Sequence, residues 1–456
     1  MTFHVMIIPT LNCPSNCKYC WGSENKKEMM DIEIIDQIIT WLDDFRDDKV
    51  HFTFHGGEPL LAGYDFYKEA LEKLSQLENL DGFSLQSNIW LLSDELIDLF
   101  VKYNVVVSTS IDGPKEINDY QRGEGYFDKT MGKYELAKSK GLIINFVLTV
   151  TDYSKDFSDE LYEFFKGEKM SLKIHAALPS LRGDNADPWA LDQEEHGKLL
   201  VDWLDKYLYD LDKFVIMDLD HICKSALRRR GTLCTFADCI GTTLAVGSDG
   251  SIYPCYRFVG MPEYVLGNVA DNPSFDDLKE SDAWAKLQEF RDYVDENCRK
   301  CRYVKYCEGG CPYNAIVAYQ TPQAVDPQCT AYKMIFGEVS KRMNKEFLYV
   351  GYYIDTCGNY ILKIGTTNDL CRRQSEHTRN YRKAPKHRMP QDEQFKMLWY
   401  RPLSKYNTFR YEDRNRDWWK EIGFGEFVRN DRFVFDVPPV QAVVRIKKEW
   451  VVAINV

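Results

Sequence analysis

The chain has 456 residues, which is enough for two or three domains with separate hydrophobic cores. It carries 58 Lys and Arg against 70 Asp and Glu, a net charge of -12, which argues against a general nucleic-acid coat or a membrane-surface protein. No apolar run reaches the roughly eighteen residues that a membrane-spanning helix needs, and no basic segment of a signal peptide opens the chain. We therefore expect no membrane partner and a cytoplasmic location, where cysteines serve as metal ligands or buried thiols rather than as disulfides.

Six apolar segments alternate with amphipathic helices through the first 225 residues. The helices have apolar residues three and four positions apart, as in residues 31–45 and 64–77. The expected strands are residues 3–9, 51–56, 83–88, 105–112, 142–150 and 172–179. This alternation predicts an α/β fold with parallel strands and outer helices, a partial (β/α)6 barrel similar to a TIM barrel. In such barrels the functional side chains gather at the carboxyl ends of the strands.

The character of the chain changes twice after this pattern. Residues 234–329 are rich in cysteines, aromatic residues and turns, which predicts a small irregular domain stapled by metal. A helix is expected near residues 331–344, followed by two strands within 347–365. Residues 346–456 hold 20 Lys and Arg against 14 Asp and Glu, a net charge of +6, whereas the preceding residues have -18, so we expect a separate small α+β C-terminal domain. The predicted domains are residues 1–228, 229–345 and 346–456.

Three cysteines follow the first expected strand in the spacing C-x3-C-x2-C: Cys13, Cys17 and Cys20. Three thiolates and one ligand from elsewhere suit a tetrahedral zinc ion. They also suit a four-iron cluster, because three thiolates leave one of its irons free for a small-molecule ligand. The spacing alone leaves both interpretations open.

Further motifs follow the next three strands in order. "GGEP" (56–59) comes after the second strand, "LQSN" (85–88) after the third and "SIDGPKEINDYQRG" (110–123) after the fourth. Together with the tyrosine in "CKYC" (17–20), this order resembles the radical S-adenosylmethionine (SAM) superfamily. The resemblance implies that the free iron binds the amino and carboxylate groups of SAM, and that the cluster's electron cleaves SAM to a 5′-deoxyadenosyl radical.

The same resemblance implies which residues bind SAM. These are Tyr19, Gly56, Gly57, Glu58, Asn88, Ser110 and Arg122, with Glu58 for the ammonium group and Ser110 and Arg122 for hydroxyl and carboxylate groups. Ile89 stands where the family usually has a glycine, so that turn is expected to differ. His55, directly before the two glycines, is expected to be a packed residue at a strand end.

Eight further cysteines lie between residues 234 and 329. Their spacing resembles the seven-cysteine SPASM domain of peptide- and protein-modifying radical SAM enzymes, and Cys234 adds an eighth thiol, as in the anaerobic sulfatase maturases. The resemblance implies two auxiliary [4Fe–4S] clusters, hence three clusters in all, besides SAM. The first would take Cys234, Cys239, Cys255 and Cys311, and the second Cys298, Cys301, Cys307 and Cys329. A zinc ribbon shares the C-x2-C pairs, and Cys223, Cys357 and Cys371 are expected to be buried thiols.

The resemblance implies an oxidation of a peptide or protein. Sulfatase maturases as a family place an aspartate base directly after the cysteine that corresponds to Cys255, and here that position is Tyr256, the one candidate catalytic residue. This departure favours maturation of a ribosomal peptide, by thioether or carbon–carbon cross-linking, over formylglycine formation. The auxiliary clusters would relay the electron that such an oxidation releases, with flavodoxin or ferredoxin as the expected electron donor.

The segment "YILKIGTTNDLCRRQSEH" (360–377) resembles the GIY-YIG nuclease-like family. The resemblance implies a strand with Gly365, then a helix, and these further matches: Arg372, Arg373, His377, Glu412 and either Tyr349 or Tyr353. Nucleic acid is thus a candidate partner of the C-terminal domain alone. Two other classes of function stay open for the whole protein: a redox-sensing nucleic-acid-binding or nuclease protein, and a multi-cluster electron-transfer protein. The simplest role of the C-terminal domain is that of a substrate-docking or structural appendage.

Overall fold

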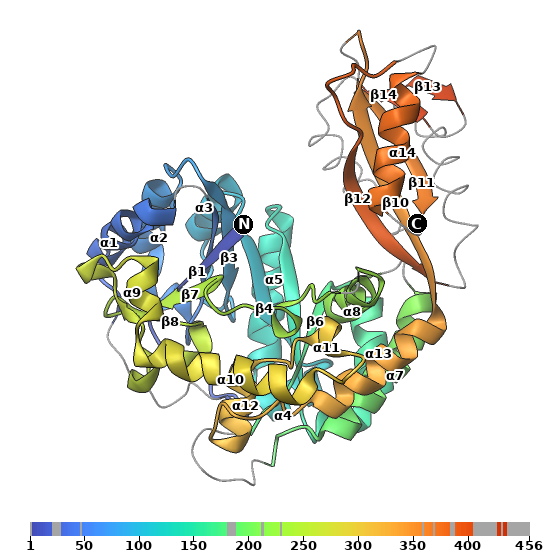
Figure 1. Ribbon diagram of the computed structural model, residues 1–456. Coiled ribbons are helices and arrows are strands. Elements are labelled where there is room, and N and C mark those ends of the chain that lie inside the picture. Colours follow the sequence, from blue (N-terminus) through green and yellow to red (C-terminus); the bar gives the residue numbers. More distant parts are fainter. Residues whose placement is uncertain are drawn as a thin grey trace. The chain divides into compact units, whose positions relative to one another are not determined.

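A parallel sheet forms the centre of this computed structural model of the protein (Figure 1). The structure describes residues 2–20, 29–45, 48–179, 188–210, 214–228, 230–357, 360–367, 370–383, 388–404, 426–429 and 432–435. The first six strands are β1 (Thr2–Ile7), β2 (Lys49–Phe54), β3 (Leu80–Gln86), β4 (Val106–Ser110), β5 (Ile144–Val150) and β6 (Leu172–Ala176). All six overlap the predicted segments, and neighbouring strands pair in parallel. The predicted α/β fold with a parallel-strand barrel is therefore confirmed.

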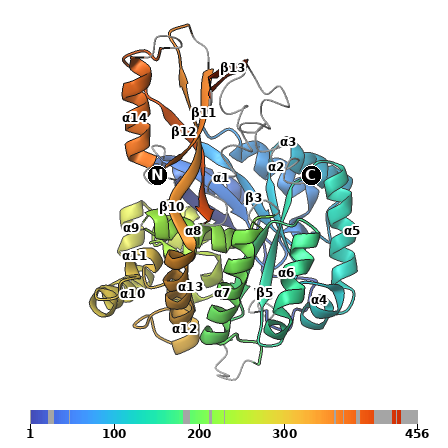
Figure 2. The ribbon, with the colours of Figure 1, turned by 90° about the vertical axis from the view of Figure 1, so that its right-hand side faces the viewer.

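Helices lie outside the curved sheet (Figures 1 and 2). They are α1 (Glu33–Trp41), α2 (Gly63–Leu74), α3 (Asp94–Lys102), α4 (Lys115–Arg122), α5 (Tyr126–Ser139) and α6 (Ser158–Gly167). Helix α3 is an example of how the local sequence forms and orients these helices. The Ser93 hydroxyl accepts a hydrogen bond from the Leu96 amide, acidic residues occupy the first turn, and Leu96, Ile97 and Phe100 are buried. An amphipathic face and a capped N-terminus therefore fix this helix on the sheet.

The sheet continues past β1 into the cysteine-rich stretch, which the sequence pattern did not predict. The full order is β6-β5-β4-β3-β2-β1-β7-β8-β9, with β7 (Thr243–Val246), β8 (Ser251–Tyr253) and β9 (Gly267–Asn268). Strand β7 runs parallel to β1, so that His4 lies beside Thr243 and Ile7 beside Val246. Strands β8 and β9 are antiparallel to their neighbours.

The expectation of a small irregular structure in residues 234–329 is wrong in one respect. Four helices form there: α9 (Phe275–Lys279), α10 (Asp282–Cys298), α11 (Val304–Cys307) and α12 (Pro312–Tyr319). A hydrophobic cluster joins α10 and α12 to the chain that follows β1 and includes Leu11, Phe258, Tyr264, Leu287 and Tyr313. Apolar packing therefore contributes to the stability of this stretch besides any metal ligation.

By contact density the chain divides into two compact units. The first comprises residues 1–200, 215–218 and 230–334, and the second residues 201–214, 219–229 and 335–456. Helices α7 (Gln193–Tyr209), α8 (Met217–Arg228) and α13 (Cys329–Arg342) contribute residues to both. The three-domain boundaries expected from the sequence stay predictions.

The second unit holds an antiparallel sheet with the strand order β12-β10-β11-β14-β13. The elements are β10 (Met343–Ile354), β11 (Tyr360–Thr367), α14 (Leu370–Arg382), β12 (Lys396–Ser404), β13 (Glu426–Arg429) and β14 (Arg432–Phe435). Cys223 is buried as expected, whereas Cys357 is exposed in the turn after β10, so that expectation is wrong; the side chain of Cys371 lies outside the described residues.

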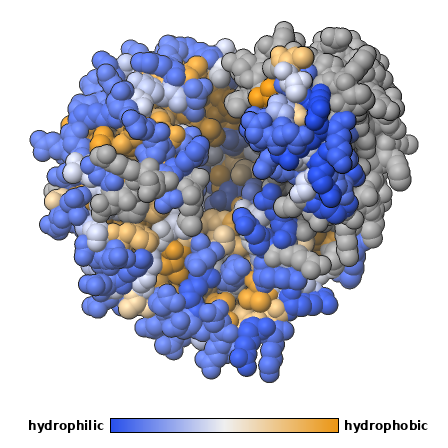
Figure 3. Space-filling view, turned by 45° about the horizontal axis from the view of Figure 1, so that its top comes forward, coloured by the Kyte–Doolittle hydropathy of each residue, from blue (hydrophilic) through white to orange (hydrophobic). Residues whose placement is uncertain are grey.

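Hydrophilic residues cover most of the face seen in Figure 3, and hydrophobic residues gather in small groups. Among the described residues, no helix has both the length and the apolar character needed to cross a membrane.

The GGEP segment pairs with the chain that follows β1. The amides of Gly57 and Glu58 donate hydrogen bonds to the carbonyls of Thr10 and Asn12, at 3.0 and 2.7 Å. A Cβ atom on Gly57 would stand 2.4 Å from the carbonyl oxygens of both Leu11 and Asn12. The glycine is needed because two backbone segments touch there.

We expect Gly57→Ala to destabilise the protein by about 1–3 kcal/mol, since the new methyl group must displace backbone. Gly132→Ala is the matched control: this position has nothing within 4 Å of an added Cβ, and it lies inside α5. There we expect a gain of about 0.5–1 kcal/mol. Anaerobic thermal melts of both variants check the difference, and equal melting temperatures would contradict it.

Candidate active site

The three N-terminal cysteines lie together at the carboxyl end of β1. Desolvation by the surrounding chain is the main cause that raises the pKa of Cys13 to about 11, and the nearby Cys17 and Cys20 thiols contribute to this rise. The Cys17 sulfur is 3.0 Å from the Ser15 hydroxyl and 3.8 Å from Nη1 of Arg122. The loop therefore presents three thiols on one side, with a guanidinium beside one of them.

A buried carboxylate, Asp112, ties this loop to the barrel. Its Oδ2 accepts hydrogen bonds from the Tyr19 hydroxyl at 2.6 Å and from Nε2 of Gln121 at 2.9 Å. Its Oδ1 accepts from Nη2 of Arg122 at 2.8 Å and from the Thr149 amide at 2.9 Å. The carboxylate thus joins the cysteine loop, α4 and β5, and Arg122 forms a buried ion pair with it.

Glu58 is fully buried directly after the two glycines. Its Oε1 accepts hydrogen bonds from the Leu60 amide and the Ser87 hydroxyl, and its Oε2 from the Asn88 amide. Burial nevertheless raises the pKa of Glu58 to about 7. A positively charged partner would therefore find a carboxylate that is already oriented and incompletely stabilised in its charged form.

The turn after β3 adopts the backbone conformation that a glycine would adopt easily. Ile89 has φ 60°, although it carries a β-branched side chain that is fully buried. The turn that was expected to differ thus keeps the left-handed geometry, and burial of the Ile89 side chain offsets the backbone strain. Asn88 lies beside the cysteines, with Nδ2 3.9 Å from the Cys13 sulfur. At the end of β4, Ser110 accepts a hydrogen bond from Nε2 of Gln86 at 3.2 Å.

The first set of four auxiliary cysteines lies together at the other end of β1. Cys239 precedes β7, and its pKa is raised by a hydrogen bond with Cys234, by burial and by the nearby thiols of Cys311 and Cys255. Burial also raises the pKa of Cys255 to about 12 and that of Cys311 to about 11. These four cysteines, expected from the sequence to form one group, are brought together.

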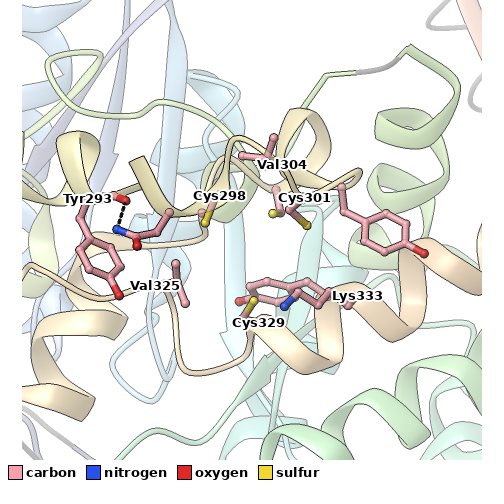
Figure 4. A pocket seen from close by; sticks show the side chains of 12 residues that line it. Tyr293, Cys298, Cys301, Val304, Val325, Cys329 and Lys333 are labelled. Atoms are coloured by element: carbon pink, nitrogen blue, oxygen red, sulfur yellow. Dashed lines mark hydrogen bonds between the residues drawn. The ribbon is translucent and has the colours of Figure 1, made fainter. Parts of the chain in front are cut away.

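The second set surrounds a cavity of about 220 Å³ (Figure 4). Cys298, Cys301, Cys307 and Cys329 line it. Burial and the other three thiols raise the pKa of Cys307 to about 12. Lys333 also lines this cavity, and the nearby Cys329 thiol raises the pKa of its ammonium, so a positive charge stands at this set.

A second buried carboxylate, Asp326, holds the loops of these cysteines. Its Oδ2 accepts from the Cys311 amide at 2.9 Å, from Nδ2 of Asn314 at 2.8 Å and from the Tyr332 hydroxyl at 3.1 Å. Its Oδ1 accepts from the Gln328 amide at 2.8 Å. Four donors thus compensate the desolvation of this carboxylate.

Tyr256 opens a short 3-10 helix, η5 (Tyr256–Phe258), directly after Cys255. Its ring stacks on His55 with the centroids 4.0 Å apart. Nε of Arg257 lies 3.2 Å from the Tyr256 hydroxyl, and Nη1 donates to Oδ1 of Asn314 at 2.7 Å. His55 is packed as expected, but against the candidate catalytic residue.

The comparisons with known proteins agree with this geometry. A model of the radical SAM superfamily matches residues 7–165, and a model of the SPASM iron–sulfur cluster-binding domain matches residues 234–302. The chain belongs to the radical SAM superfamily. It is an enzyme of the SPASM subfamily, and these two domains imply iron–sulfur clusters and SAM.

Relatives of this radical SAM enzyme include an uncharacterized protein of Methanothermobacter thermautotrophicus, 48% identical over 51% of this chain and 89% of the relative. The serine-type anaerobic sulfatase-maturating enzyme of Bacteroides thetaiotaomicron is 26% identical over 75% of this chain and 90% of its own. Among solved structures, that of anSMEcpe with bound AdoMet (SAM) and the Kp18Cys peptide has a TM-score of 0.66 and 25% sequence identity. The match covers 75% of this chain and 98% of the anSMEcpe chain.

The thiols of the radical SAM enzyme fit iron–sulfur clusters better than single ions. In the described part of the chain, no three His, Cys, Asp or Glu side chains converge closely enough to hold one metal ion. Each predicted cysteine set nevertheless lies close enough for its thiols to shift one another's pKa values. A cubane binds each thiolate at a different iron, so its ligands stand farther apart than those of one ion.

Two of the C-terminal residues proposed from the GIY-YIG resemblance lie near each other, since Tyr353 and His377 both stack on Tyr381. Tyr353 and His377 are buried in a hydrophobic cluster with Phe395, and Arg372 and Arg373 pair with Glu376 on α14. Glu412 lies outside the described residues, as does the side chain of Tyr349. The GIY-YIG resemblance stays a prediction.

Sequence reasoning missed Asp112, Asp326 and Arg257. Asp112 stands in the quoted "SIDG" motif, and its place after a strand was the signal that could have found it. Asp326 and Arg257 carry no comparable signal, because neither stands in one of the quoted motifs or directly after one of the six predicted strands.

We expect Asp112→Asn to destabilise the radical SAM core by about 3–5 kcal/mol, because Arg122 would stay buried without its counter-charge. The control is Asp128→Asn, which removes the exposed ion pair with Lys115 and costs about 0–1 kcal/mol. Thermal melts of the two variants provide the test. If Asp112→Asn lowered the stability as little as Asp128→Asn does, the buried ion pair would not hold the cysteine loop.

Proposed function

We propose that this radical SAM/SPASM enzyme cleaves SAM and oxidises a side chain of a peptide, forming a thioether or carbon–carbon cross-link in ribosomal-peptide maturation. The observation that carries the proposal is the stacked pair of Tyr256 and His55. By the family resemblance, Tyr256 stands where sulfatase maturases carry an aspartate base, so formylglycine formation lacks its base at that position. The peptide bound in anSMEcpe supports a peptide as the substrate.

The cysteines would hold three [4Fe–4S] clusters in the sets described above. Cys13, Cys17 and Cys20 would leave one iron free for SAM, whereas each auxiliary set would fill all four corners. When bound, the clusters supply the electron that cleaves SAM and accept the electron that the oxidation releases. Reduced thiols are needed throughout, which favours a cytoplasmic location and an electron donor such as flavodoxin or ferredoxin.

The chain's own groups would bind and orient SAM. Glu58 would accept the ammonium group, because a buried carboxylate with a raised pKa gains most from a positive partner. Arg122 has an Nε atom that is buried without a hydrogen-bond partner in the described residues, and it would meet the SAM carboxylate. Ser110 and Asn88 would contact the remaining polar groups, and Tyr19 would hold the cysteine loop through Asp112.

Formylglycine formation is the second candidate. Its support is the similarity to serine-type and cysteine-type sulfatase-maturating enzymes, each 26% identical over more than 70% of this chain. An aldehyde in the product distinguishes it from a cross-link.

The C-terminal domain would serve in docking rather than in nuclease chemistry. This is favoured by the burial of Tyr353 and His377, because side chains that pack in a core cannot reach a phosphate. A nucleic-acid partner would instead show strong, salt-dependent binding of DNA or RNA by this protein.

We expect SAM affinity to rise about tenfold from pH 6 to pH 8. The pKa of Glu58 is raised to about 7, so its carboxylate is mostly protonated at pH 6 and ionised at pH 8, and only the ionised form attracts the ammonium. Anaerobic calorimetry with SAM on the reconstituted protein measures the change. Glu58→Gln should bind weakly at both pH values, whereas Glu72→Gln on the exposed side of α2 should keep the slope. A slope that survives Glu58→Gln would contradict the assignment.

The reaction is tested with the reconstituted enzyme, a reductant and the peptide encoded beside its gene. A cross-link removes two hydrogen atoms: one leaves with the deoxyadenosyl group and the other as a proton and an electron. We expect this mass loss without an aldehyde that reacts with a hydrazide. Cys13→Ala should abolish 5′-deoxyadenosine formation while about two-thirds of the iron remains bound.

A hydrazide-reactive product would favour the formylglycine candidate instead. SAM cleavage with an unchanged peptide would reject this choice of substrate. Activity that survives Cys13→Ala would reject the radical mechanism altogether.

A further inference from the structure

The concave face of the barrel sheet is polar. Closed barrels fill their interior with branched apolar side chains, but here the apolar residues alternate onto the outer face beneath the helices. The strand register places these residues together on the concave face: His51, Thr53, Ser84, Gln86, Ser108, Ser110, Asn145, Val147, Thr149, Lys173 and His175. The Ser84 hydroxyl shares hydrogen bonds with His51 and with Thr53, and Nε2 of Gln86 donates to the Ser110 hydroxyl, which joins members of this set. We call this surface the lumen.

Two positively charged groups lie at the lumen without an acidic partner: Lys173 belongs to its strand register, and Nε of Arg257 is 3.2 Å from the hydroxyl of Tyr256, whose ring stacks on His55. Lys173, on β6, makes no hydrogen bond or ion pair within the described ranges, although it is half-buried. Arg257 bonds to Asn314 and Tyr256, which are both uncharged, and no carboxylate in the described residues comes within ion-pair distance of it. A buried guanidinium without a counter-charge is costly, so the site is prepared for an anion.

The acidic groups nearby are committed elsewhere. The Asp218 carboxylate accepts the Ile174 amide at 2.5 Å, and Asp112 is paired with Arg122. Glu58 accepts three hydrogen bonds at the SAM end. Burial raises the pKa of Asp218 to about 6, which reduces the charge it can offer Lys173.

Two histidines add neutral hydrogen-bond donors to the same surface. Nδ1 of His55 accepts the Gly56 amide at 2.7 Å, so a neutral ring carries its proton on Nε2. Burial lowers the pKa of His55 to about 4, which keeps the ring neutral. His175 is on β6 two residues after Lys173, and its ring has no hydrogen-bond partner among the residues that the structure describes.

We propose that the lumen binds a carboxylate of the peptide residue to be modified, held by Lys173 and Arg257, with His55 and His175 as further donors. This rests on the function proposed above and names its substrate class: a peptide whose reacting residue bears, or directly adjoins, a carboxylate. Two sources share this chemistry, an acidic side chain and a C-terminal carboxylate. Bidentate pairing with arginine and a nearby ammonium would fix the reacting carbon.

A competing role for the same cations is to balance the charge of the thiolates. The pKa of Cys234 is lowered, first by its hydrogen bond with Cys239 and then by Lys173 and Arg257. The two roles predict different effects of substituting these cations. If they bind the substrate, the substitution changes peptide recognition; if they balance the thiolates, it changes the reduction potential of the auxiliary cluster.

The test uses the reconstituted holoenzyme with SAM and without reductant, so that nothing turns over. Anaerobic calorimetry compares three tripeptides in which alanines flank the central residue: aspartate with both ends capped, asparagine with both ends capped, and asparagine with a free C-terminal carboxylate. We expect one of the two carboxylate peptides to bind at least about tenfold more tightly than the fully capped asparagine peptide, and which one does so identifies the source.

Lys173→Met and Arg257→Met should each remove the preference, and Arg257→Lys should keep part of it. Lys138→Met, on the exposed side of α5, should leave it unchanged. Equal binding of the three peptides to the wild type overturns the proposal. The proposal is also overturned if both methionine variants keep the preference for the carboxylate peptide while the reduction potential of their auxiliary cluster shifts.

Reductant-dependent SAM cleavage is measured on the same preparations. Intact cleavage with no carboxylate preference overturns the substrate class alone. Carboxylate preference without any SAM cleavage overturns the proposed function instead.

Discussion

The parallel pairing of β1 with β7 is the constraint on which the arrangement depends. Strand β1 leads at its carboxyl end into the loop of Cys13, whereas β7 begins just after Cys239, beside His4 at the opposite end. The antiparallel β7–β8 hairpin returns Cys255 to that same end. Two thiol sets thus stand at opposite ends of one sheet with the lumen between them. A shift of one residue in the pairing would turn every side chain of β7 to the other face.

The two faces of the barrel sheet divide stability from chemistry. On the outer face, Val5, Phe52, Phe146 and Leu148 are buried under the helices and supply apolar stabilisation. On the concave face the polar residues contribute little to that core. Substitutions on the first face should lower the yield of folded protein, whereas those on the second should alter what the folded protein binds.

Much of this could be predicted from the sequence, because the signals are local. Alternating periodicity located all six parallel strands, and cysteine spacing grouped the eleven thiols into sets that the structure brings together. The β1–β7 pairing could not be predicted, since it joins segments more than 200 residues apart and β7 is only four residues long. The surroundings of Arg257 were missed because a charge in the sequence does not say which groups surround it: Nη1 of Arg257 donates a hydrogen bond to Asn314, 57 residues further along the chain.

Asp326 has a consequence for how the protein acquires its metal. Its carboxylate binds the amide of Cys311, which belongs to one auxiliary set, and the chain that leads into α13, which starts with Cys329 of the other. Ordering either loop by metal ligation therefore orders part of the other. Such linkage is reciprocal, so the two sets should fill cooperatively, and a chelator should strip them together rather than one after the other.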